Sequence, residues 1–340
     1  MSDPSAATQT SRTLRRRFVW SLVLALVIYL ALAVYGDLAR LREALSSFPW
    51  VSLPLILGLT LVNYVGRLIK WHWYLGLVGA KLGWRDSARI FGVGMSMVMT
   101  PGKVGELLKS YMVKQVAGTP MSITAPIVLA ERLTDGLAML VLAGVGLTAF
   151  PDPRLRLAAL AALAALLTVV LLVQVRPLAR AVLALGERTP GMHRFAHNLA
   201  TFYESSYTLL APRNLCIAVS IGTVSWLGEG LAYYVVLTGL GAQPGLQTAL
   251  KAVFIFSIST IVGALVATPG GLGGTEGSLV ALCEQLLGLA RAPATASTLI
   301  VRLATLWFGV AIGLASMARW PELLAGVGDQ EMTGDQEVSE

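Results

Sequence analysis

The sequence has few charged residues, few cysteines and few histidines. Only 13% of its 340 residues are charged, whereas soluble proteins carry about a quarter. Cys216 and Cys283 both lie in apolar runs, so we expect neither a disulfide framework nor a cysteine metal site. His193 and His197 stand one helical turn apart with no carboxylate or cysteine at supporting spacing. These scarcities argue against a soluble protein, and we expect no metal and no cofactor.

The sequence contains several long apolar runs. Hydrophobic residues make up 55% of the chain, and several runs reach the roughly 20 residues that cross a bilayer as a helix. The runs are continuous, unlike the short alternating segments of a membrane β-barrel. We therefore predict an all-α polytopic membrane protein with about six transmembrane helices, near residues 18–35, 51–68, 122–149, 155–175, 215–240 and 294–317.

Two related stretches interrupt the apolar runs. Thr100–Glu106 and Thr268–Glu276 each combine proline and glycine, which break helices, with a carboxylate at the end. Short apolar arms flank each break, so we predict two re-entrant hairpins, near 88–116 and 247–290. Such irregular backbone is tolerated at membrane depth only inside protein or beside a watery cavity. The residues that make the breaks are Pro101, Gly102, Gly105, Pro269, Gly270, Gly271 and Gly273.

The distribution of Lys and Arg predicts the topology. With both termini inside and both hairpins returning to their side of origin, most basic residues face the cytoplasm, as the positive-inside rule requires. An odd number of crossings then separates repeat 1 (about 51–149) from repeat 2 (about 215–318), which makes the repeat inverted. The net charge of +7 fits anionic lipid headgroups better than nucleic acid. We expect a cytoplasmic segment at 1–17, one transmembrane domain at 18–320 and a disordered acidic tail at 321–340.

Arg132 and Arg302 are the charges that most need an explanation. A central intramembrane charge costs at least a few kcal/mol, so both should have partners. Arg132 can reach Asp135, three positions on, and Glu131 shares that helix face. Glu106 and Glu276 follow the breaks, where helix dipoles favour carboxylates. The other candidates for a substrate-binding site are Lys103, Arg67 and Glu229.

Two interpretations of these charges stay open. In the first, the charges neutralise one another and lock the hairpins to the spans. In the second, the arginines and the exposed helix N-termini bind phosphate, while the carboxylates balance the arginines or carry protons. Arg67 could point toward a headgroup or toward water, because it begins a basic and aromatic stretch, ending at Tyr74, that is typical of a membrane interface.

The motifs together resemble a known family. Gly105-Glu106 after a Pro-Gly break, Glu131-Arg132 with Asp135, and the second break with Glu276 are similar to the lysylphosphatidylglycerol synthase transmembrane family, the flippase-like domain also found in bacterial multiple peptide resistance factors. The similarity runs from about residue 15 to 320 and rests on the order and spacing of the motifs. It implies a multi-pass inner-membrane protein that moves lipids between leaflets. Aminoacyl transfer belongs to a separate soluble domain of the two-domain relatives, so we expect no synthase activity here.

The leading hypothesis is a flippase or scramblase for an anionic lipid or a polyprenyl phosphate, with Arg132 and Arg302 on the phosphate. An inverted-repeat transporter of a small anionic solute is the alternative, followed by a membrane enzyme acting on a lipid phosphate. We expect no enzyme, because no nucleophile–base pair, metal cluster or nucleotide motif appears. A subunit without transport of its own, and a homo-oligomer, are compatible with the sequence. In the second half Thr305 stands where Asp135 stands in the first, so the half-sites differ.

Overall fold

The computed structural model describes residues 4–100, 105–150, 153–174 and 193–324, which form helices and turns and contain no strand. The α-helices are α1 Pro4–Tyr35, α2 Leu38–Ser47, α3 Leu53–Leu77, α4 Trp84–Ser96, α5 Leu108–Ala117, α6 Met121–Gly146, α7 Pro153–Gln174, α9 His193–Leu209, α10 Pro212–Gly239, α11 Leu246–Val266, α12 Gly274–Leu287, α13 Arg291–Arg302 and α14 Phe308–Arg319. Short 3₁₀ turns are η1 Trp50–Ser52, η2 Met97–Met99, η4 Leu147–Ala149, η5 Pro269–Gly271 and η7 Pro321–Leu324, and η6 Leu303–Trp307 is a π-helix.

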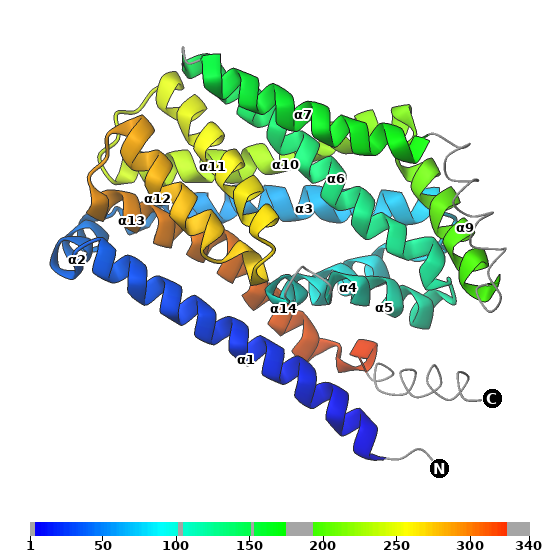
Figure 1. The fold of residues 1–340 in the computed structure, drawn as a ribbon. Helices are drawn as coiled ribbons and strands as arrows, with labels where there is room; N and C mark the ends of the chain where they lie inside the picture. The colour runs from blue at the N-terminus through cyan, green and yellow to red at the C-terminus, as the bar shows by residue number, and fades with distance from the viewer. Residues whose placement is uncertain (1–3, 101–104, 151–152, 175–192, 325–340) are drawn as a thin grey trace.

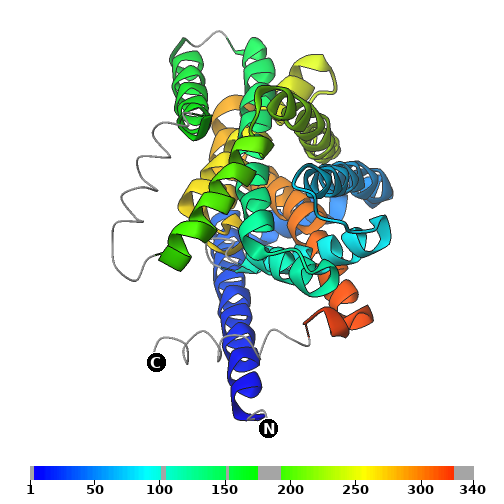
Figure 2. The same cartoon turned by 90° about the vertical axis from the view of Figure 1, so that its right-hand side faces the viewer.

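Three long helices form the centre of the molecule. Helix α10 packs against both α3 and α6, and the three run through the whole length of the bundle (Figure 1). The α11–α12 hairpin fills one half of that length and α4 with α5 fills the other. Helix α1 contacts α13 at one end and diverges from the bundle toward its own N-terminal end (Figures 1 and 2). The centre of the bundle is thus enclosed by elements that enter from opposite ends.

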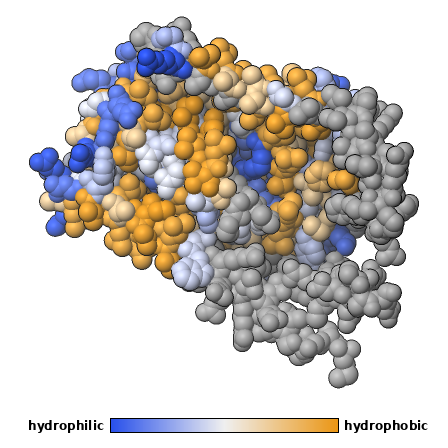
Figure 3. Space-filling model, viewed as in Figure 1, coloured by the Kyte–Doolittle hydropathy of each residue, from blue (hydrophilic) through white to orange (hydrophobic). Residues whose placement is uncertain are grey.

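Helix length and surface agree with a bilayer setting. Trp50–Leu77, Pro212–Gly239, Leu246–Val266 and Arg291–Arg319 are long and apolar enough to cross, and Trp20–Tyr35 with Leu38–Ser47, bent by 96°, makes a fifth candidate. Helices α6 and α7, with 26 and 22 residues, also reach the roughly 20 residues needed. Apolar side chains form broad bands over one face, with some hydrophilic ones between them near the middle and others at the end that holds α2 (Figure 3). The predicted all-α polytopic membrane fold is confirmed.

The segment before the first break meets the second break inside the protein. Segments η2 and η5 are in contact, and Met99 and Leu272 share an apolar cluster with Ala25 of α1. Gly270, Gly271 and Gly273 have φ of 61°, 70° and 86°, which glycine adopts without steric cost. Pro101, Gly102 and Lys103 lie outside the described residues.

The arms of the two hairpins differ in length. Helices α4 and α5 have 13 and 10 residues, too few for the roughly 20 of a crossing. Helix α11 has 21 residues and is long enough to cross, whereas the sequence predicts a re-entrant arm there. The apolar run simply continues further before the second break.

Helix α3 extends past its predicted end at residue 68 to Leu77, and the interfacial stretch predicted there is wrong for Lys70, Trp71 and Tyr74. All three are fully buried, because the helix turns them into the bundle. The predicted tail from residue 321 also begins later: η7 is a 3₁₀ turn, with Leu323 buried in the cluster around Trp71. Residues 325–340 lie outside the described part of the chain.

Gly313 sets the approach of α14 to α4. A Cβ placed on Gly313 would overlap the backbone of Ser96. We expect Gly313→Ala to lower the free energy of unfolding by about 1–3 kcal/mol, the usual cost of overpacking. The same substitution at Gly58, where a Cβ meets nothing within 4 Å, should cost nothing. Detergent denaturation followed by circular dichroism compares the two, and equal stabilities would contradict the close α4–α14 contact.

Candidate functional site

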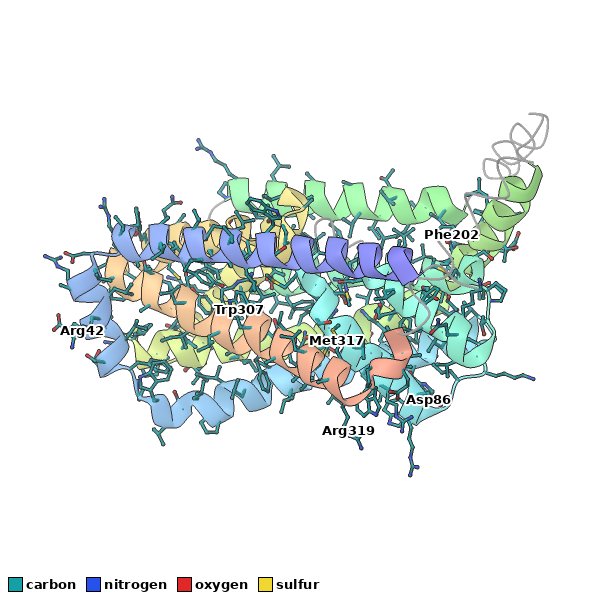
Figure 4. The ribbon with its side chains drawn as sticks, turned by 90° about the horizontal axis from the view of Figure 1, so that it is seen from below. Arg42, Asp86, Phe202, Trp307, Met317 and Arg319 are labelled. Carbon is teal, nitrogen blue, oxygen red and sulfur yellow. The ribbon has the colours of Figure 1, made fainter. Side chains whose placement is uncertain are left out.

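A cavity lies midway along the bundle. Its volume is about 120 Å³, which is room for several waters. Thr305 lines it, and the nearby Trp307 lies near the middle of the molecule, with Arg42 at one end and Asp86 toward the other (Figure 4). The charged side chains that line the cavity are Arg67, Glu106, Lys109, Arg132, Glu229 and Arg302.

The first half of the chain supplies three ion pairs. Glu106 Oε2 lies 3.0 Å from Arg132 Nη2. Lys109 Nζ on α5 donates to Glu131 Oε2 on α6 at 2.6 Å, with both side chains almost fully buried. Behind them, buried Lys70 of α3 pairs with Asp135 of α6. The predicted contact between Arg132 and Asp135 is present but long, at 3.9 Å.

In the second half of the chain, Arg302 stabilises the second helix break. Arg302 Nε donates to Glu276 Oε1 at 2.6 Å, and its Nη2 donates to the carbonyl of Gly270 at 2.7 Å. The other oxygen of Glu276 accepts from the Gly273 amide at 2.7 Å, which caps α12. In each half the carboxylate precedes its arginine by 26 residues. The two halves therefore build the same ion pair.

The cap changes one expectation about phosphate binding. The sequence interpretation offers the exposed N-terminus of α12 to an anion. The structure shows the Gly273 amide already bonded to Glu276, because a carboxylate three residues into the helix reaches back to the amide before it. The prediction that the N-terminus of α12 is free to bind an anion is therefore wrong for the Gly273 amide.

Arg67 and Glu229 line the cavity but belong to none of the ion pairs described above. No ion pair within 4 Å joins either of them to another described residue. The Arg67 guanidinium lies over the Trp226 ring, 5.7 Å from its centre. Glu229 is only 5% exposed. The cavity thus has one arginine available to a ligand and one buried carboxylate without a close cation.

Most predicted site residues come together here. Arg67, Glu106, Arg132, Glu229, Gly270, Gly271 and Arg302 line the cavity, and Glu131, Asp135 and Glu276 bind its cations or their neighbours. Gly105 lies beside it and donates its amide to Thr100 Oγ1 at 2.9 Å. Lys103 is outside the described residues. Among those described, no group of three or more His, Cys, Asp or Glu side chains could hold a metal ion.

Sequence reasoning missed Lys70 and Tyr64. The Tyr64 hydroxyl lines the cavity and donates to the Thr305 carbonyl within η6. A signal was present for Lys70, because the inward side of α3 repeats alternately every four and three positions, as one helix face does. Its members are Ile56, Thr60, Asn63, Arg67, Lys70 and Tyr74.

Comparisons with known proteins agree with this architecture. A family model described as the lysylphosphatidylglycerol synthase TM region matches residues 18–313. A UPF0104 membrane protein of Methanothermobacter thermautotrophicus is 26% identical over 278 residues, covering 73% of this chain and 79% of its own length. A second UPF0104 membrane protein of that organism is 25% identical over 315 residues, covering 85% of this chain and 90% of its own length. The chain belongs to the lysylphosphatidylglycerol synthase transmembrane family.

Proposed function

We propose that the protein moves a lipid with an anionic, phosphate-bearing headgroup between the leaflets of a cell inner membrane, as a flippase or scramblase. The observation that carries the proposal is the convergence of Arg67, Arg132 and Arg302 on one cavity midway along the bundle. A charged headgroup pays a large penalty in the hydrocarbon core. A polar cavity at that depth lowers the penalty, while the acyl chains stay among the apolar side chains of the surface.

The three arginines have different roles in this proposal. Arg67 binds the phosphate, because its guanidinium has no carboxylate partner close by and guanidinium binds phosphate through paired hydrogen bonds. Arg132 and Arg302 keep their carboxylates and add positive potential from the cavity wall. The sequence hypothesis gave the phosphate to Arg132 and Arg302, so the pairing seen here moves the main contact to Arg67.

We also propose the orientation. The start of α1 and the end of α14 lie at the same end of the molecule (Figure 1), and the positive-inside rule assigns that end to the cytoplasm. The matching Glu106–Arg132 and Glu276–Arg302 pairs support a repeat. Because the hairpins enter from opposite ends (Figure 1), we propose that this repeat is inverted.

Arg67→Gln tests the function. A hydrogen bond to a charged group contributes about 1.5–3 kcal/mol, so we expect labelled phosphatidylglycerol to exchange between leaflets of proteoliposomes at least about tenfold more slowly. Arg40→Gln, at a side chain 79% exposed, is the matched control and should exchange at the wild-type rate. Equal rates for all three proteins would refute phosphate binding by Arg67.

The same cavity also suits a small anionic solute. If labelled inorganic phosphate entered vesicles saturably while labelled lipid stayed in its leaflet, the solute transporter would replace the lipid transporter. We propose no catalytic reaction for the site. Incubation with a lipid phosphate and a search for a new product would reveal one.

A further inference from the structure

The charges around the cavity are balanced. Among the described residues, four ion pairs and the separate Arg67 and Glu229 give five cations and five carboxylates. With every one of these described groups ionised, their charges sum to zero. A headgroup with one negative charge therefore brings a charge that none of them offsets in the resting site, and in a low-dielectric interior that is costly.

Among the described residues, Glu229 is the cavity carboxylate that can lose its charge without breaking an ion pair. Protonating Glu131, Asp135 or Glu276 would take the partner from a buried cation, and protonating Glu106 would break the 3.0 Å pair with Arg132. Glu229 has no described cation within 4 Å, and it lines the cavity from α10.

The groups that face Glu229 come from every side of the cavity. Helix α3 presents Arg67 and Tyr64, α6 presents Arg132 and Asp135, α13 presents Arg302, and Glu106 and Lys109 lie across the cavity, while α11 presents uncharged Phe256 and Thr260. Arg67 and Arg302 are the cations whose charges act on Glu229. Arg302 is held by Glu276, so Arg67 is the cation that a phosphate can draw away.

We propose, building on the lipid transport proposed above, that Glu229 takes up one proton when an anionic headgroup binds Arg67 and releases it when the headgroup leaves. The proton comes from the aqueous phase on the side where the lipid enters and departs on the other side. Lipid and proton then cross together without net charge.

The end-point distribution of lipid tests this coupling. Proteoliposomes carry labelled phosphatidylglycerol and a pH difference of one unit, with the membrane potential clamped at zero by potassium and valinomycin. Coupling of one proton per lipid should enrich the lipid about tenfold in the leaflet on the alkaline side, because one pH unit equals a tenfold ratio. Glu229→Gln should give equal leaflets, and Glu229→Asp should keep the enrichment. Glu43→Gln, an exposed carboxylate on α2, should also keep it.

The final distribution of lipid between the leaflets does not depend on the exchange rate, so a variant with slow exchange can still be compared with the wild type. Equal leaflets in the wild-type protein, with exchange intact, would overturn the coupling and leave the lipid transport standing. Enrichment retained in Glu229→Gln would overturn the role of Glu229. Absence of any exchange in the wild type would overturn both proposals. If phosphatidylethanolamine movement required Glu229 while phosphatidylglycerol ignored the gradient, Glu229 would bind a headgroup amine and not a proton.

Discussion

Arg302→Ala is expected to lower the free energy of unfolding by about 3–5 kcal/mol, the usual cost of removing one partner of a buried ion pair. Glu276 is completely buried and would lose its cation. The variant also removes the hydrogen bond from Arg302 to the Gly270 carbonyl, which helps to hold the second break. Titration with dodecyl sulfate in mixed micelles, followed by circular dichroism, measures the difference.

Two controls make this result specific. Arg40→Ala removes an exposed arginine whose contact with Asp37 is 3.7 Å long, and such surface pairs contribute at most about 1 kcal/mol. The double variant Glu276→Gln, Arg302→Met should recover most of the lost stability, because no buried charge remains and the glutamine oxygen can still accept from Gly273. A double variant as unstable as Arg302→Ala would contradict the explanation by unpaired charge.

Lys70→Ala is expected to cost a similar amount, about 3–5 kcal/mol, because it leaves buried Asp135 with only its long 3.9 Å contact to Arg132. Lys70 is fully buried and pairs with Asp135. Lys81, a few residues beyond the end of α3, is exposed, and Lys81→Ala should change stability by less than about 0.5 kcal/mol, as surface substitutions do. The same denaturation series compares the two lysines.

This experiment also decides between two descriptions of α3. A lysine at a membrane interface, as the sequence suggested, would tolerate alanine as well as Lys81 does. A loss confined to Lys70 would place it inside the bundle, and the double variant Lys70→Met, Asp135→Asn should then regain stability. Similar values for both lysines would contradict the buried pair.

Much of the architecture follows from the sequence, because bilayer thickness fixes how long an apolar run must be. The predicted spans near 122–149 and 215–240 agree with α6 and α10 within a few residues. The need to neutralise intramembrane arginines correctly predicted that Arg132 and Arg302 have carboxylate partners, although the sequence named Asp135 for Arg132 and the closer partner is Glu106. Both inferences use constraints that act on every membrane helix, whatever its neighbours.

The remaining features depend on which helices meet. Lys70 looks interfacial by hydropathy, and only the packing of α3 on α6 shows that it faces Asp135. The predicted role of Arg302 as a phosphate ligand missed that Glu276 and Gly270 already occupy two of its nitrogens. Hydropathy measures how a residue partitions into lipid, whereas these contacts depend on partners distant in the chain.

The π-helix Leu303–Trp307 joins α13 and α14 into one long helix and fixes how far one is rotated about the helix axis relative to the other. Such a turn holds one residue more than an α-helical turn, and each residue of an α-helix adds about 100° of rotation. Deleting a single residue between 303 and 307 would restore a regular helix and swing Arg302 by that angle relative to Gly309 and Gly313. Those glycines must face Tyr64 and Ser96 for α14 to fit. A chain shortened by one residue there could keep its close packing or its ion pair to Glu276, but not both.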